Sequence, residues 1–298
     1  MPAIASPPRL LVLGASGRLD QAILRHLLTT LRVDPQRIIV GTREPAKLQE
    51  LVDQGVEVRR YDLLEEETFE GAIKDASRVL IISTAHDGRA NFVTLLDTLA
   101  KYDVEHVSYT SFYGVETSTA DFTPTFRAAE RAFGESKLKA CSLLRNGYYT
   151  GVTFPAFRAA LKTGKWYSAM QSGRVTYTSI DALGLANAVA LVGDKPVDQI
   201  VSLTGPEALS VEDVVKSFND ILGKTFELAH VSAEELTAHL EEHVGLPAQL
   251  AHAMASIDAS VVTGDVAVVT NDYEKLVGTS PGTMADWICE SKDLLLAM

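Results

Sequence analysis

Short apolar runs alternate with helix-like segments through the first half of the chain. The apolar runs predict strands at residues 10–13, 37–40, 56–59, 79–82, 106–109 and 142–144. Between them, helical spacing of apolar residues predicts helices at 19–31, 45–54, 65–73, 91–101 and 125–136. Short apolar strands that alternate with helices are typical of a parallel sheet covered on both faces. The pattern therefore predicts an α/β fold with a doubly wound parallel-sheet Rossmann core.

The second half of the chain has a less regular pattern. Strands at 166–169 and 175–178 predict a hairpin that turns at Gln171-Ser-Gly173. A further strand is predicted at 199–203, and Ser210-Val-Glu-Asp213 resembles a capping box that opens a helix. From residue 233 onward most segments have helical patterns. We expect a Rossmann domain at 1–150 and a smaller, mostly helical substrate lobe at 151–298, with a segment at about 174–204 that returns to the core.

The first predicted strand leads into Gly14-Ala-Ser-Gly17-Arg18, which is how a Rossmann dinucleotide site begins. Gly14 lets the chain turn tightly, and Gly17 lets the backbone approach a pyrophosphate that the N–H groups at the helix start then bind. Asp20 stands where the pattern normally has a third glycine. Its carboxylate repels a pyrophosphate and its side chain crowds the contact between helix and strand. We therefore expect Asp20 to weaken cofactor binding without abolishing it, and Asp20→Gly to tighten NADPH.

The residues after the next strands bear on the choice of cofactor. An NAD-preferring protein usually has an acid after the second strand, whereas this chain has Arg43. A guanidinium suits a 2′-phosphate, and Arg18 can add a second positive charge, so NADP(H) is favoured unless both arginines are solvated surface residues. Asp62 follows the third strand, where it either approaches the adenine ring or caps the next helix. Ser83 and Thr84 close the fourth strand, beside the ribose or nicotinamide or as a simple polar strand end.

The chain lacks the catalytic pair of a standard short-chain dehydrogenase. That pair is Tyr-x-x-x-Lys, in which the lysine lowers the pKa of the tyrosine. None of the nine tyrosines has a lysine at that spacing, which argues against standard alcohol–ketone chemistry. Polar groups instead follow the fifth and sixth strands, in Tyr109-Thr-Ser-Phe-Tyr113 and Leu144-Arg-Asn-Gly-Tyr-Tyr149. Both segments are predicted at the edge of the sheet that carries the glycine turn, where they can surround a nicotinamide, although Tyr148 and Tyr149 alternatively pack the lobe.

Composition and charge exclude several classes of function. The formal net charge is −12, which argues against nonspecific nucleic-acid binding because that needs a basic surface. Two cysteines make no disulfide framework, and no apolar run approaches the roughly 18 residues that span a membrane. His239 and His243 lack the zinc-protease order because no glutamate follows His239, so we expect a solvated helix face and no metal. A cytoplasmic protein is the expected class.

Taken in order, the motifs resemble those of the NmrA-like branch of the atypical short-chain dehydrogenases. They are most similar to those of type 2 NADPH:quinone oxidoreductases and triphenylmethane reductase. The resemblance covers nearly the whole chain through the segments Gly14-Ala-Ser-Gly17, Arg43-Glu-Pro-Ala-Lys47, Gln54-Gly-Val-Glu-Val-Arg59, Tyr109-Thr-Ser111, Leu143-Leu-Arg-Asn-Gly-Tyr148, Val244-Gly-Leu-Pro247 and Lys275-Leu-Val-Gly278. Each motif is weak alone, and their order and spacing make the resemblance specific.

The resemblance implies a Rossmann core that binds NADPH and a small C-terminal substrate lobe. It implies cofactor contacts for Gly14, Ser16, Gly17, Arg18, Arg43, Ser83 and Thr84, and it places Tyr109–Ser111, Asn146 and Tyr148 at the nicotinamide pocket. From their positions at strand ends we add Asp62, Thr110 and Ser111 as cofactor-binding candidates. The candidate catalytic residues are Tyr113, Asn146 and Tyr148, and the candidate pocket walls are Phe112, Phe126 and Tyr149. The family's His-x-x-Thr-Glu becomes Phe126-x-x-Ala129-Glu130, so a polar pair at the active site is missing. This departure suits a bulkier or more apolar substrate.

Three functions are compatible with these residues. The first is an NADPH-dependent oxidoreductase that transfers a hydride to a quinone or similar conjugated molecule, which needs mainly proximity and orientation. The resulting anion is delocalised and can take a proton from water, while Tyr113 or Tyr148 can donate a hydrogen bond to it. The second is a non-catalytic NADP(H)-sensing regulator of the NmrA type, and the third is a pathway-specific reductase or isomerase of a bulky aromatic natural product. We expect no nucleic-acid or membrane partner, and a homodimer or a protein partner stays open.

Overall fold

The computed structural model describes residues 7–14, 17–84, 87, 89–193 and 199–298. The chain divides into two compact units, each assembled from segments that are distant in the sequence. Unit 1 comprises Met1–Ser111, Thr125–Arg145 and Leu183–Val201. Unit 2 comprises Phe112–Pro124, Asn146–Ala182 and Ser202–Met298. None of the described helices is long and apolar enough to cross a lipid bilayer.

Unit 1 is built on a seven-stranded sheet, to which unit 2 contributes the last residues of three strands. In spatial order the strands are β10 (Ile200–Leu203), β6 (Cys141–Asn146), β5 (His106–Phe112), β4 (Arg78–Ile81), β1 (Leu10–Leu13), β2 (Ile38–Thr42) and β3 (Glu57–Arg60). β1 pairs in parallel with both β2 and β4, so Leu13 lies between Gly41 and Ile81. The strand order reverses at β1, which is where open α/β sheets bind ligands. The prediction of a doubly wound Rossmann core is confirmed.

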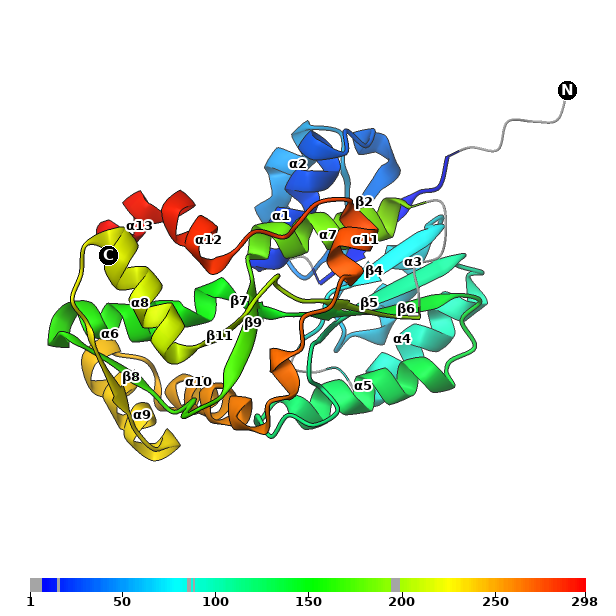
Figure 1. The fold of residues 1–298 in the computed structure, drawn as a ribbon. Coiled ribbons are helices and arrows are strands. Elements are labelled where there is room, and N and C mark those ends of the chain that lie inside the picture. Colours follow the sequence, from blue (N-terminus) through cyan, green and yellow to red (C-terminus); the bar gives the residue numbers. More distant parts are fainter. Residues whose placement is uncertain (1–6, 15–16, 85–86, 88, 194–198) are drawn as a thin grey trace, which may run out of the picture. The chain divides into compact units, whose positions relative to one another are not determined.

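Helices cover both faces of this sheet (Figure 1). One face carries α3 (Phe69–Ile73), α4 (Ala90–Lys101) and α5 (Thr123–Glu135), and the other carries α1 (Arg18–Arg25), α2 (Gln49–Asp53) and α7 (Ile180–Val192). On the first face, Phe92 and Phe133 are buried in one core with Tyr109 of β5. On the second, α1 and α7 approach so closely that a Cβ on Gly184 would lie 2.5 Å from the Ala22 Cβ. The helix predicted at 19–31 is interrupted, because α1 passes at Arg25 into a π-helical turn.

Unit 2 contains two small sheets and most of the remaining helices. The strands are β7 (Tyr148–Tyr149), β8 (Lys165–Ser168), β9 (Arg174–Thr178), β11 (Ala208–Ser210) and β12 (Glu227–His230). The helices are α6 (Phe154–Thr163), α8 (Val211–Leu222), α9 (Ala233–His239), α10 (Ala248–Ser260), α11 (Asp272–Val277), α12 (Met284–Glu290) and α13 (Lys292–Leu296). The predicted capping box opens α8, since the Ser210 hydroxyl accepts the Asp213 N–H at 3.3 Å and the Asp213 carboxylate accepts the Ser210 N–H at 3.0 Å.

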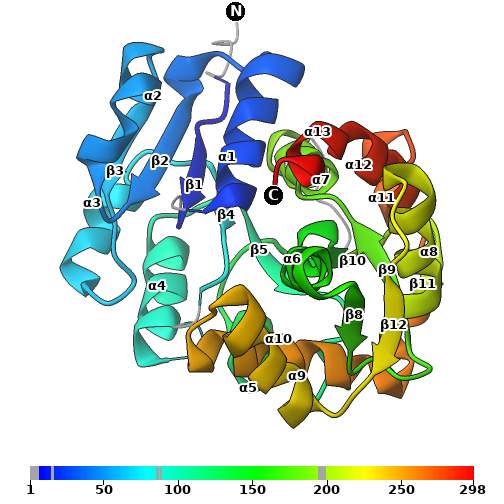
Figure 2. The same cartoon turned by 90° about the vertical axis from the view of Figure 1, so that its left-hand side faces the viewer.

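The hairpin predicted from 166–169 and 175–178 is wrong. β8 pairs in parallel with β12, as Figure 2 shows beside α9 and α10, whereas β9 pairs with β7 and β11. The cause lies far away in the sequence, at Asp258 of α10. Its carboxylate accepts the Ala169 N–H at 2.6 Å and the Ser168 hydroxyl at 2.7 Å, and the Met170 N–H donates to that hydroxyl at 3.1 Å, so these groups at the end of β8 are not available to a hairpin ladder. Gly173 then closes a local turn by donating its N–H to the Met170 carbonyl at 2.8 Å.

Candidate functional site

The turn between β1 and α1 is formed by backbone that requires glycine. Gly14 has a φ of +92°, which L side chains rarely adopt, and a Cβ there would lie 3.0 Å from the Ile82 carbonyl oxygen. Its N–H donates to the Gly41 carbonyl at 3.2 Å, which ties the turn to β2. Arg18 begins α1 with an exposed side chain, as predicted. Ser16, the remaining candidate in this turn, lies outside the described residues.

Asp20 is accommodated by turning its carboxylate back onto the start of α1. The side chain is only 3% exposed, and its Oδ1 accepts the Gly17 N–H. Burial raises the pKa of Asp20 from 3.8 to about 6, although hydrogen bonds from the backbone N–H groups of Gly17, Asp20 and Gln21 lower it. A pyrophosphate at a Rossmann helix start binds N–H groups of this kind. The carboxylate therefore already occupies donors that a dinucleotide needs.

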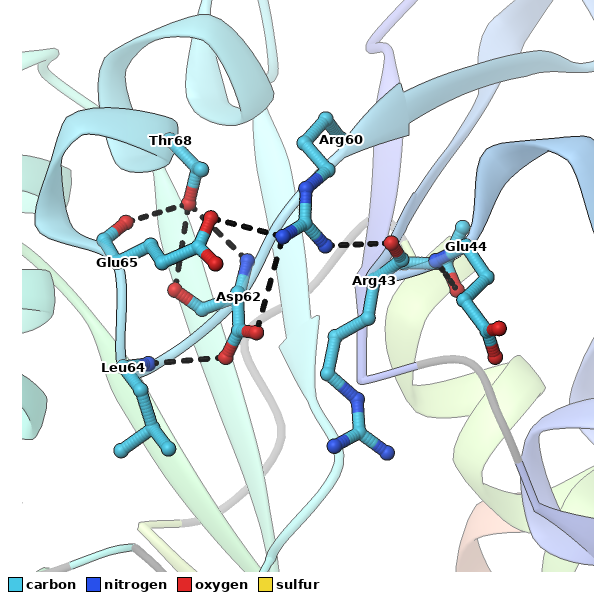
Figure 3. A network of polar contacts seen from close by, with 8 residues as sticks. Arg43, Glu44, Arg60, Asp62, Leu64, Glu65 and Thr68 are labelled. Atoms are coloured by element: carbon cyan, nitrogen blue, oxygen red, sulfur yellow. Dashed lines mark hydrogen bonds and ion pairs between the residues drawn. The ribbon is translucent and has the colours of Figure 1, made fainter.

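Arg43 extends from the end of β2 with its guanidinium unengaged. In the described part of the chain this group makes no hydrogen bond, and Figure 3 shows it pointing away from the polar network beside it. The sheet places this exposed cation one strand away from the glycine turn, because β1 and β2 are neighbours. A free guanidinium in this position can form paired, charge-assisted hydrogen bonds to a phosphate group.

The neighbouring network is centred on Arg60 at the end of β3 (Figure 3). Its guanidinium donates to the Arg43 carbonyl and, at 2.8 Å, to the Glu65 carboxylate. Arg60 therefore fixes the backbone from which the Arg43 side chain extends. Sequence reasoning missed this residue, and the available signal was its position at a strand end next to the strand that carries Arg43.

Asp62 takes part in a local turn. Its Oδ1 accepts the Leu64 N–H at 3.0 Å, and its own N–H donates to the Thr68 hydroxyl at 3.0 Å. Its second carboxylate oxygen is 3.9 Å from the Arg60 guanidinium. These contacts form a turn before the next helix, whose N-cap residue is Glu65, so the capping alternative for Asp62 is wrong and a contact with adenine stays a proposal.

The ends of β4 and β5 are joined by side-chain hydroxyls. The Thr110 hydroxyl accepts the Ser83 N–H at 2.8 Å and donates to the Ser83 hydroxyl at 3.1 Å. The Ser111 hydroxyl is buried and has no hydrogen-bond partner among the described residues. Leaving a buried polar group unpaired costs about 1–3 kcal/mol. Ser111 lies near the C-terminal end of β5, so its unpaired hydroxyl suits a group that faces a ligand.

Asp87 organises the segment that follows β4. Its carboxylate accepts the Thr84 N–H at 2.8 Å, the Thr84 hydroxyl at 2.9 Å and the Tyr109 hydroxyl at 2.8 Å. Thr84 and Tyr109 are therefore held by an internal acceptor. Sequence reasoning missed Asp87, which was visible only as one acid in a polar segment.

The other predicted site residues belong to unit 2. The Asn146 carbonyl accepts the Tyr113 N–H at 2.8 Å. The Tyr148 hydroxyl lies 3.3 Å from that of Ser260, and because Ser260 donates to a carbonyl, Tyr148 is the donor in this pair. Burial raises the pKa of both Tyr148 and Tyr149, so both hydroxyls keep their protons at neutral pH. The Phe112 ring packs edge-on against that of Phe122 at 4.9 Å.

On α5, the residues that depart from the family pattern have distinct surroundings. Phe126 is half-buried, and Ala129 is fully buried in the core of unit 1. Glu130 accepts two hydrogen bonds from Arg145 of β6, at 3.0 and 2.7 Å. This paired contact was missed by sequence reasoning because the two residues meet only in the folded sheet. It fixes the helix that carries Phe126 against β6.

The histidine pair is not the solvated face that the sequence predicts. His239 is only 8% exposed, and its ring stacks on that of Tyr167 with 3.8 Å between centroids. Burial lowers the pKa of His239, and the prediction of a solvated position is wrong for this residue. In the described ranges, no three or more histidine, cysteine, aspartate or glutamate side chains form a group that could hold a metal.

Comparison with known proteins gives relatives along almost the full chain. Quinone oxidoreductase 2 of Escherichia coli is 26% identical over 279 residues, which cover 92% of this chain and 96% of the relative. The NAD(P)H azoreductase of Xenophilus azovorans is 24% identical over 282 residues, with 93% and 96% covered.

Solved structures give the same fold. That of the Escherichia coli NADPH-dependent quinone oxidoreductase complexed with NADPH has a TM-score of 0.86 and 24% identity, over 94% of this chain and 98% of that one. The triphenylmethane reductase of Citrobacter sp. complexed with NADP(H) has a TM-score of 0.85 and 25% identity, over 95% of this chain and 99% of that one. The model of the NmrA-like family matches residues 8–288, and the chain belongs to that family.

Proposed function

We propose that this protein is an NADPH-dependent oxidoreductase that transfers a hydride to a quinone or a similar conjugated small molecule. Its relatives include a quinone oxidoreductase, an azoreductase and a triphenylmethane reductase. The single observation that carries the proposal is the unengaged Arg43 guanidinium, one strand from the glycine turn. This cation distinguishes the 2′-phosphate of NADPH from the 2′-hydroxyl of NADH.

The residues present fit the cofactor at most points. The glycine backbone at Gly14 allows a pyrophosphate to approach, Arg43 offers a free phosphate ligand, and Ser111 offers an unpaired hydroxyl. Among the described residues, Asp20 opposes binding, because it occupies the Gly17 N–H. When bound, NADPH supplies the hydride, and the chain's own residues hold and orient it.

We assign the acceptor side to the predicted residues Tyr113, Asn146 and Tyr148, with Phe112, Phe126 and Tyr149 as apolar walls. A conjugated acceptor makes a modest demand on these groups, because the anion that forms is delocalised and water can protonate it. Hydrogen-bond donation from a tyrosine to the developing oxyanion adds stabilisation. Tyr148 would have to exchange its bond to Ser260 for this purpose.

The first experiment titrates the purified protein with NADPH and with NADH, following nicotinamide fluorescence. Menadione is then added to the NADPH complex and absorbance at the nicotinamide band is recorded. We expect NADPH to bind more tightly than NADH and to be oxidised when the quinone is added. Binding of NADPH without oxidation by any quinone or azo dye would reject the proposed reaction while leaving the cofactor assignment intact.

A non-catalytic NADP(H) sensor is the second candidate, and the contact between Asp20 and Gly17 favours it. A carboxylate on the pyrophosphate donors raises the Kd, so occupancy changes over a higher range of cofactor concentration. A sensor would bind NADP⁺ and NADPH without turnover and would change its affinity for a protein partner. The quinone assay therefore separates the two candidates directly.

Arg60→Gln is expected to weaken NADPH binding about three- to tenfold and to leave NADH binding nearly unchanged. The substitution removes the guanidinium that binds the Arg43 carbonyl, so the backbone of Arg43 is less ordered in the free protein. Arg43 then loses more conformational entropy when it binds the phosphate. Fluorescence titrations with both nucleotides measure the effect. Arg60→Lys, which can still reach one of the two acceptors, should lie between the wild type and Arg60→Gln. An equal loss for NADH would show general unfolding of this region instead.

We also propose the cytoplasm as the place of action. Cys141 is half-buried and Cys289 is exposed, and both are free thiols, which is the usual state in a reducing compartment. A homodimer or a protein partner stays a proposal, which sedimentation of the purified chain would test.

A further inference from the structure

Asp258 of α10 is a half-buried carboxylate of unit 2 whose hydrogen-bond donors among the described residues are neutral. Its Oδ2 accepts the Ser168 hydroxyl at 2.7 Å and the Ala169 N–H at 2.6 Å, and the Met170 N–H donates to the same Ser168 hydroxyl at 3.1 Å. Burial raises the pKa of this carboxyl, and none of the described lysines, arginines or histidines forms an ion pair with it. Buried charges in proteins are ordinarily paired. The position therefore lacks the cation that such a group normally has.

A small pocket opens directly beside this carboxylate. It has a volume of about 50 Å³, and Asp258 is its only charged lining residue in the described part of unit 2. Trp166, Tyr167 and Tyr177 supply aromatic surface, and the rest of the wall is mostly aliphatic. At roughly 10–15 Å³ for each water-sized group, the space suits about three to five non-hydrogen atoms.

Two tyrosines, Tyr148 and Tyr177, interact electrostatically with Asp258, but their hydroxyls contact other groups. The Tyr177 hydroxyl contacts the Met170 sulfur at 3.6 Å, and the Tyr148 hydroxyl donates to Ser260. His239 packs on Tyr167 and has a lowered pKa, so it is neutral at physiological pH. The described residues thus provide no positive charge for this pocket.

We propose that this pocket, the Asp258 pocket, binds the ammonium group of a small aliphatic amine. The carboxylate pairs with the positive charge, and the aromatic side chains attract a cation through their ring faces. Aliphatic lining residues such as Leu236 and Leu240 then contact a short alkyl chain. The net charge of −12 further favours cations near the protein.

Bound water is the main alternative occupant. A buried water needs two to four polar partners, and the hydroxyls of Ser168 and Thr153 already donate to the Asp258 carboxylate and the Thr150 carbonyl. A short alkylammonium uses the apolar surface that water leaves unsatisfied. An uncharged alcohol of equal size uses that surface as well but leaves the carboxylate without a counter-charge. The charge of the ligand is therefore the property to test.

Isothermal titration calorimetry of the full chain with propylammonium chloride, at constant ionic strength, tests the proposal. We expect one binding site, with 1-propanol binding at least tenfold more weakly. Asp258→Asn should weaken propylammonium at least tenfold, to the level of 1-propanol, because asparagine keeps an acceptor for Ser168 and Ala169 but has no charge. Asp97→Asn is the matched control, since it removes the same charge from an exposed position on α4 and should change nothing.

A second variant tests the location independently of the charge. Ala156→Leu adds three carbon atoms to the pocket wall while Asp258 remains, and it should weaken propylammonium at least fivefold. Circular dichroism melting confirms that each variant is folded, and Ala156→Leu decides the question where Asp258→Asn fails to fold. Equal affinity of the wild type and Asp258→Asn would overturn the proposal. Absence of heat with propylammonium would also overturn it and would leave water as the occupant.

Discussion

Arg43→Leu is expected to raise the Kd for NADPH roughly 30- to 150-fold while the Kd for NADH stays within about twofold. A charged hydrogen-bond partner contributes about 2–3 kcal/mol where it meets a phosphate, and each 1.4 kcal/mol is a factor of ten in Kd. The guanidinium makes no hydrogen bond among the described residues, so its removal leaves no internal partner exposed. The loss should therefore appear in binding and not in stability.

Nicotinamide fluorescence titrations at fixed ionic strength measure both dissociation constants. Arg131→Leu is the matched control, because it removes the same charge from an exposed position on α5 in the same unit. It should leave both nucleotides unaffected apart from a small change in long-range electrostatics. A comparable loss of NADH affinity in Arg43→Leu, or no loss of NADPH affinity, would contradict the assignment of Arg43 to the 2′-phosphate.

The role of Arg43 in binding the 2′-phosphate also accounts for the hydrogen bonds of Arg60 beside it. A long side chain loses rotamer freedom when it binds, and part of that cost falls if its backbone is already fixed. Arg60 provides this by binding the Arg43 carbonyl while Glu65 holds the other end of its guanidinium. The sequence shows an arginine at the end of β2 and another at the end of β3. Their different roles follow from the pairing of these two strands. One residue contacts the ligand, and the other positions the backbone.

Local signals predicted the parts of the fold that local forces determine. The start of α1 follows directly from Gly14, whose positive φ only glycine adopts readily, and the capping box at Ser210 lies within four residues. The strands of the parallel sheet were recognisable because their side chains are buried on both faces.

Features set by distant residues could not be predicted in the same way. The sequence between β8 and β9 looks like a hairpin, but Asp258 lies about ninety residues later and accepts the Ala169 N–H that a hairpin needs. The sequence around His239 is largely polar and predicts an exposed side chain. Its burial follows from packing against Tyr167 of β8. The Glu130–Arg145 contact likewise requires α5 to lie against β6. In each case the determining partner belongs to another element.

Asp20→Asn is expected to increase the free energy of unfolding by about 3 kcal/mol at pH 8 and to have almost no effect below pH 4. The carboxyl has a pKa of 3.8 in its ordinary state and about 6 in the folded chain, so the folded protein holds the proton more tightly. Each pKa unit is worth about 1.36 kcal/mol. The ionised carboxylate therefore costs stability above pH 6, and the cost fades as the pH falls from about 6 to 3.8.

Denaturant unfolding at several pH values measures this difference between the variant and the wild type. Asparagine keeps an oxygen that can accept the Gly17 N–H, so the start of α1 is retained. Asp97→Asn, which removes an exposed carboxylate from α4, should leave the free energy of unfolding unchanged at every pH. A pH-independent gain in Asp20→Asn would indicate better packing and would contradict the role of the charge.

The same substitution should tighten NADPH binding about tenfold at pH 8, and Asp20→Gly should do so as well. A neutral amide oxygen competes more weakly than a carboxylate for the Gly17 N–H, glycine does not compete for it, and both substitutions remove a like charge from the helix start. Because protonation neutralises the wild-type carboxyl, the advantage of Asp20→Asn should shrink as the pH falls from 8 towards 5.5. Titrations with NADP⁺, which survives mild acid, follow this convergence, and the comparison of two proteins cancels the titration of the nucleotide itself. Unchanged affinity in both variants would show that the dinucleotide does not use these donors, and the departure from the third glycine would then be neutral for binding.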